Sequence, residues 1–308
     1  MKATDLFSIT KQSFQEWGED RAPNEAAALA YYAMISVPAL LLLIQWVLGQ
    51  VVSDQVQDQV INFVQQSVRG GGGEAIGNII ENADRPGSGG GIAAIASLAA
   101  LALSATGVVG NLEQALNRMW EIAEEDVGIV DKIKKRLSSL LVVLVLGFFL
   151  VASVTLSTVV SAFADTLTDI LPVPRWTVQV VHVLFSLLLL TLLFAATLKF
   201  LPDAEVAWSD LWLGAAVTAV LFVVGQVVLG LYLGRSAPGS AYGVAGSVVA
   251  LLVWIYYSAL ILFLGAEFTQ VYANRFGSRI RPDESAITVQ EKVRRDQAQP
   301  SEEPQPKK

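Results

Sequence analysis

Long stretches without a charged residue recur along the chain and alternate with shorter polar segments. Each stretch is long enough for the helix of about 20 apolar residues that crosses a bilayer. The last one, Gly243 to Glu267, is the clearest, and it ends abruptly on a carboxylate. The pattern predicts an all-α, polytopic integral membrane protein with six transmembrane helices, within residues 26–53, 92–109, 137–164, 176–198, 211–234 and 243–267.

Some of the polar segments carry a helical apolar stripe. In residues 4–18, Leu6, Ile9, Phe14 and Trp17 recur near helical spacing, which predicts an amphipathic helix. Two placements are open for it: in the membrane interface, with Trp17 at headgroup level, or packed as a short helix on the cytosolic face. A second amphipathic helix is expected to continue from the second span to about residue 125.

The chain changes character after the sixth span. From Phe276 onward it is charged and rich in Pro and Gln, and it has no apolar period. Such a composition predicts disorder. The predicted organisation is therefore a transmembrane domain with its N-terminal helix over residues 1–275 and a disordered, charged cytoplasmic tail over residues 276–308.

The distribution of Lys and Arg predicts the orientation. Of the 21 basic residues, 17 fall in segments on the side of the N-terminus and only Arg69, Arg85, Arg175 and Arg235 fall on the other side. Basic residues favour the cytoplasmic face. Both termini are expected in the cytoplasm.

Composition excludes several functions. The chain has 308 residues, of which 53% are hydrophobic and 16% charged, with a net charge of −7. That balance gives no basic footprint for nucleic acid. The absence of Cys and the single His exclude a thiolate or multi-histidine metal centre. We expect no cofactor, no metal and no enzymatic activity, with the lipid bilayer as partner and a small solute or ion as a further one.

Three separated motifs carry a family resemblance. They are AAALAYYAMIS at 26–36, ALNRMW at 115–120 and YGVAGSVVALLVWIYYSALILFLGAEF at 242–268. With these motifs the chain resembles the YihY/BrkB membrane proteins over roughly residues 5–275. The resemblance implies six transmembrane helices in a bacterial cytoplasmic (inner) membrane. Members carry a virulence-factor label or an older ribonuclease label, and the family supplies no catalytic motif to transfer.

Polar residues inside predicted spans are the candidates for function, because such residues are costly in a bilayer. Glu267 ends the sixth predicted span, and Gln270 lies on the same helical face. Glu267 either caps the helix or pairs with a basic neighbour such as Arg118, or it couples protons or cations. His182 in the fourth span is either a proton relay or a hydrogen-bonded packing residue.

Amides form the remaining candidates. Gln226 lies in the fifth predicted span and Gln45 in the first. Each is expected either to form hydrogen bonds between helices or to contact a substrate. Asn111, Asn117 and Arg118 lie on the second amphipathic helix, which either lines a cytosolic vestibule or covers the bundle.

Intramembrane polar residues without a catalytic constellation favour a transporter, exporter or channel-like protein. A membrane scaffold or envelope-associated factor is the alternative, and an intramembrane enzyme ranks last because no nucleophile or metal motif is present.

Overall fold

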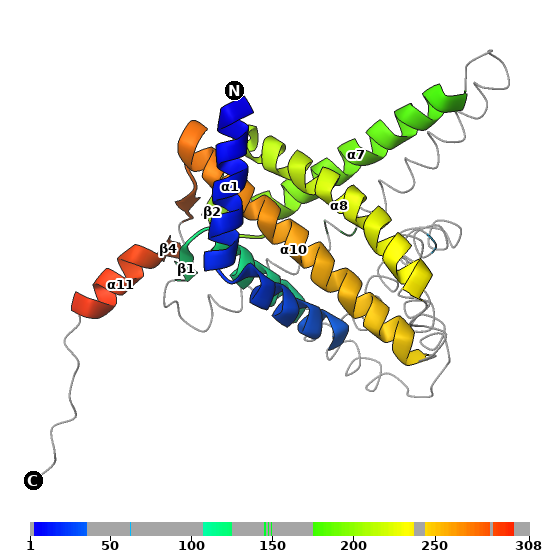
Figure 1. The fold of residues 1–308 in the computed structure, drawn as a ribbon. Coiled ribbons are helices and arrows are strands. Elements are labelled where there is room, and N and C mark those ends of the chain that lie inside the picture. Colours follow the sequence, from blue (N-terminus) through cyan, green and yellow to red (C-terminus); the bar gives the residue numbers. More distant parts are fainter. Residues whose placement is uncertain are drawn as a thin grey trace, which may run out of the picture.

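The computed structural model describes residues 3–35, 107–124, 175–236, 244–283 and 286–298, together with isolated positions at 62, 145, 147 and 149. Figure 1 shows these segments in colour. Among them, long helices dominate. The labelled elements are α1 (Ala3–Glu19), β1 (Ile122–Glu124), α7 (Arg175–Phe200), β2 (Ala204–Glu205), α8 (Trp208–Ser236), α10 (Val244–Phe276), β3 (Arg281–Pro282), β4 (Ala286–Thr288) and α11 (Val289–Ala298).

Helices α7, α8 and α10 are long and apolar enough to cross a membrane. The qualifying stretches are Val183–Phe200, Trp208–Leu231 and Val248–Phe276. These match the fourth, fifth and sixth predicted spans. The second and third predicted spans lie almost wholly outside the described residues. The first is described only in part, as a helix over 22–35.

Helix α8 packs against both α7 and α10, and its contact with α10 is a seam of small residues. Gly214 lies against Thr269, and Thr218 lies against Gly265. Each threonine hydroxyl donates to the carbonyl of the glycine four residues earlier on its own helix, at 2.7 Å for Thr218 and 2.8 Å for Thr269. The pairing lets two backbones approach closely while each hydroxyl keeps a partner.

Helix α1 packs on α10 and crosses it in Figure 1. Its apolar stripe explains this contact, because Ile9 is fully buried against Phe268 and Val271. The predicted amphipathic helix is thus confirmed, and one face of it packs against the protein. The opposite face leaves Phe7 73% exposed.

A tight corner joins α1 to helix 22–35. Arg21 has a φ of 55°, in the left-handed region that ends a helix. From there helix 22–35 runs beside α10, and Ala22, Ala26 and Leu29 enter the main apolar cluster.

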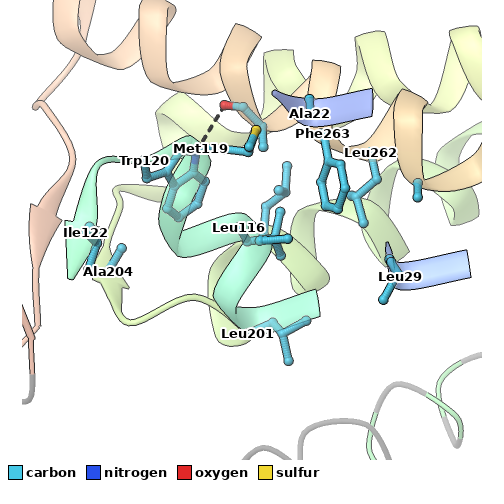
Figure 2. Packing of buried hydrophobic residues seen from close by; sticks show 14 of the residues in the cluster. Ala22, Leu29, Leu116, Met119, Trp120, Ile122, Leu201, Ala204, Leu262 and Phe263 are labelled. Carbon is cyan, nitrogen blue, oxygen red and sulfur yellow. Dashed lines mark hydrogen bonds between the residues drawn. The ribbon is translucent and has the colours of Figure 1, made fainter. Parts of the chain in front are cut away.

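The main apolar cluster forms where helix 107–119 meets α10 and helix 22–35. Figure 2 shows Phe263 and Leu262 of α10 in this cluster with Leu116 and Met119. Trp120 closes one end, and its indole Nε1–H donates to the Ala266 carbonyl at 3.0 Å.

The chain after helix 107–119 differs from the prediction. The helix ends at residue 119 rather than near 125, since Glu121 adopts a φ of 54°. The next three residues form β1, which pairs antiparallel with β4, while β2 pairs with β3. These pairings anchor the segment after α10 to the rest of the fold.

The prediction of a disordered tail from residue 276 is therefore wrong for residues 281–282, which form β3, and for residues 286–298, which form β4 and α11. The prediction failed because short strands are held by backbone hydrogen bonds and one buried side chain, Ala286, and need no apolar period. Residues 299–308 lie outside the described part of the chain.

Candidate functional site

The strongest candidate site is built around Glu267, which lies within α10. Its side chain has an exposed fraction of 0%. The prediction that it ends the sixth span is wrong, because α10 continues for nine more residues to Phe276. Glu267 therefore does not cap the helix. A buried carboxyl of this kind is costly unless it is neutral, paired or hydrogen-bonded.

Gln270, one turn further along α10, supplies a hydrogen-bond donor. With its amide nitrogen turned toward the two oxygens, it donates to the Met119 carbonyl at 2.7 Å and to Glu267 Oε2 at 3.1 Å. No amide, hydroxyl or cationic donor of the described residues reaches Oε1. Glu267 and Gln270, predicted to share one face of the helix, are thus in contact. Gln270 donates to Oε2 of Glu267, and Oε1 has no amide, hydroxyl or cationic donor among the described residues.

The remaining partner is Asp20, at the corner between α1 and helix 22–35. The carboxyl groups of Asp20 and Glu267 lie close enough to share a hydrogen bond. Two carboxylates have acceptors only, so this bond requires a proton on one of them. We call these two residues the carboxyl pair.

The surroundings of the carboxyl pair are acidic. Burial raises the pKa of the Asp20 carboxyl above its ordinary value; the hydrogen bond with Glu267 acts against the rise, and the negative charge of Glu121 adds to it. Burial also raises the pKa of Glu16, one turn earlier on α1. These surroundings favour the protonated form of the carboxyl groups at this site.

A salt bridge with Arg118 was one of the alternatives predicted for Glu267, and the structure does not contain it. Arg118 pairs instead with Glu25 of helix 22–35. The guanidinium acts on Asp20 from a distance and lowers the pKa of that carboxyl. A structural ion pair therefore does not explain the buried Glu267.

Asn117 has a structural role. Its amide nitrogen donates to Asp203 Oδ2 at 2.6 Å, and the Asp203 backbone N–H donates to Asn117 Oδ1 at 2.9 Å. Both residues are buried. This two-way contact ties helix 107–119 to the connection between α7 and α8. Asn111 donates within its own helix, to the Gly107 carbonyl at 2.8 Å.

Two further sequence candidates lie on α8 and α7. Gln226 is half-buried on α8, and His182 lies on α7, which places each on a different helix from Glu267. Gln45 lies outside the described residues.

Asp20 is the residue that the sequence reading missed. It stands just before the first predicted span, among the ordinary charges of a polar segment. The available signal was weak: an acidic residue at the junction of an amphipathic helix and an apolar one. Its partner is 247 positions away along the sequence, and only the packing of α1 on α10 joins them.

Spanning helices with a seam of small residues and a buried ionisable side chain define a helical membrane protein. The comparison with known families agrees. Residues 13–288 match the family described as Virulence factor BrkB, and the chain belongs to that family. The resemblance noted in the three motifs is thereby confirmed.

The curated relatives bear the name UPF0761 membrane protein. One from Psychromonas ingrahamii is 27% identical over 271 residues, covering 82% of each chain. One from Pseudomonas aeruginosa is 25% identical over 255 residues, covering 80% of this chain and 58% of the relative. One from Azotobacter vinelandii is 28% identical, covering 85% of this chain and 62% of the relative. No solved structure shows a significant match to the chain.

Proposed function

We propose that this protein is a transporter, exporter or channel-like protein that moves a small solute or ion across the bacterial cytoplasmic membrane. The observation that carries the proposal is the fully buried carboxyl of Glu267 on the membrane-spanning helix α10. An ionisable side chain inside a spanning helix is costly, and in membrane proteins it commonly lies on an ion or proton path. Packing alone does not call for it, because Gln would fill the same space without the charge.

We also propose that both termini face the cytoplasm. The support is the bias of basic residues, with 17 of 21 in segments on the side of the N-terminus. In this orientation the C-terminal end of α10, and with it the carboxyl pair, lies toward the cytoplasmic half of the membrane.

A non-transporting membrane scaffold is the second candidate. One observation favours it: α11 projects away from the helices in Figure 1 and leaves Val289 and Val293 about half exposed. A presented helix of this kind suits attachment of another protein.

Flux through purified protein in proteoliposomes tests the proposal. The wild type is assayed with protons, alkali cations and amphipathic solutes, beside Glu267→Gln and the control Glu19→Gln. Glu19 is an exposed residue of α1 that accepts a hydrogen bond from Gln15. We expect flux above empty liposomes in the wild type and the control, and at least a tenfold loss in Glu267→Gln. Absence of flux for every solute class would favour the scaffold.

A further inference from the structure

The N-terminal helix is held on α10 by a small set of contacts. Besides the apolar packing of Ile9, the Trp17 indole N–H donates to the Leu260 carbonyl at 3.3 Å. Near the other end, Arg275 donates to the Ser8 hydroxyl at 2.6 Å. The carboxyl pair lies at the end of α1, where the chain turns into helix 22–35. At this corner, Asp20 therefore lies next to Glu267 of α10.

We propose that Asp20 and Glu267 together bind one proton, and that this proton fastens the corner between α1 and helix 22–35 to α10. With the proton present, one carboxyl donates to the other. Without it, two carboxylates, one of them fully buried, would face each other and repel. The inference deepens the proposed function by naming the ligand of the site, and its meaning for transport rests on that function.

Two observations support a proton site at these residues. The first is the close approach of the two carboxyl groups, an arrangement that is favourable only when a proton lies between them. The second is independent of Asp20: Glu267 is completely buried, and Oε1 meets no ordinary donor of the described residues. A carboxyl placed in this way is stable when neutral and strongly destabilised when charged.

The charged groups that act on the pair come from α1, from helix 107–119 and from the turn that follows that helix. From α1, Glu16 and Glu19 add negative charge near Asp20, and from the turn after helix 107–119, Glu121 does the same. Arg118 is the cation that acts on Asp20, but Glu25 already pairs with it. The sum of these charges is negative, which favours the protonated pair.

The direction of the pH effect follows from linkage. The docked corner binds a proton that the undocked corner, with ordinary carboxyl groups in water, releases above about pH 4. The docked state therefore holds more protons, and its stability falls as pH rises above the ordinary carboxyl values, until the docked pair itself loses the proton. The docking equilibrium should fall by roughly tenfold per pH unit within that window, since one proton is involved.

Spin-label distances test the proposal in the full-length protein. The chain has no cysteine, so spin labels attach only at the two cysteines introduced for the measurement. Labels at exposed Asn24, just after the corner, and at exposed Asn274 on α10 report whether the corner is docked. The measurement is made in lipid nanodiscs from about pH 5 to about pH 10, a range above the ordinary carboxyl values.

We expect a single docked distance at acidic pH and a growing population of longer distances at alkaline pH. Glu267→Gln replaces the buried acid by a neutral amide, so this variant should keep the docked distance at every pH. The control Glu205→Gln, at an exposed position of β2, should keep the wild-type response. A wild-type distance that is independent of pH, or a Glu267→Gln variant with the wild-type response, would overturn the proposal. So would a distance that responds to added sodium or magnesium and not to pH.

An infrared measurement on the wild type keeps the proposal testable where a variant does not fold. The C=O stretch of a protonated carboxylic acid should be present at neutral pH and disappear over the same pH window as the change in distance. Its absence at neutral pH would contradict a shared proton. Neither measurement involves flux, so a proton-dependent corner without flux would remove the transport proposal and leave the proton site standing.

Discussion

Replacing Gly265 by Ala should disrupt the seam between α8 and α10. A β-carbon added at residue 265 would lie 2.9 Å from the Thr218 β-carbon and closer still to its hydroxyl, whereas ordinary contact begins at 3.4 Å. Rotating the threonine does not relieve the overlap, because its β-carbon is fixed to the backbone. The helices must therefore move apart by about half an ångström, and their close contacts weaken.

The expected cost combines two effects of opposite sign. Overpacking of a tight contact costs about 1–3 kcal/mol, while Ala in place of Gly inside a helix recovers about 0.5–1 kcal/mol. A net loss of about 1–2 kcal/mol follows. The assay is unfolding in detergent followed by tryptophan fluorescence. The control is Gly18→Ala, where an added β-carbon meets nothing within 4 Å, and which should be neutral or slightly stabilising.

A double variant sharpens this prediction. Thr218→Gly opens the space that an Ala at residue 265 would need, so the pair of substitutions should lose less stability than the sum of the two single ones. Equal losses for Gly265→Ala and Gly18→Ala, or strict additivity in the double variant, would refute the packing explanation.

Three further outcomes are expected. Asn117→Ala should destabilise the fold by about 1–3 kcal/mol, because it leaves the buried carboxylate of Asp203 without its amide donor; unfolding in detergent measures this. Deleting the chain after Arg281 should lower stability measurably through loss of the β1–β4 pairing, and an unchanged unfolding midpoint would show that the pairing contributes nothing. A reporter active only outside the cytoplasm should be silent when fused after Lys132 and active near Gly72, and the reverse result would invert the orientation.

The sequence was sufficient for the elements whose signal is local. The apolar stretches predicted α7, α8 and α10 within a few residues, except that α10 extends past Glu267. The prediction stopped at Glu267 because a charge normally ends an apolar span. Here the charge is buried, and the helix continues through Gln270 to Phe276.

Contacts between distant parts of the chain were beyond the same reasoning. The pairing of Asp20 with Glu267 depends on the corner at Arg21, and the pairing of Arg118 with Glu25 depends on helix 22–35 lying beside helix 107–119. Neither has a periodic signal. A basic partner was expected for Glu267 because a buried charge is costly unless it is paired. The proposed shared proton avoids this cost in another way, because it neutralises one of the two carboxylates.

The most direct test of the central claim is the pH dependence of flux in liposomes that contain either the wild type or Glu267→Gln. The proposed solute movement and the shared proton together predict that wild-type flux changes with pH on the cytoplasmic side, over the same window as the docking of the corner. They also predict that flux in Glu267→Gln is at least tenfold lower and flat across that window. Equal flux and equal pH dependence in the two proteins would contradict the role assigned to the carboxyl pair.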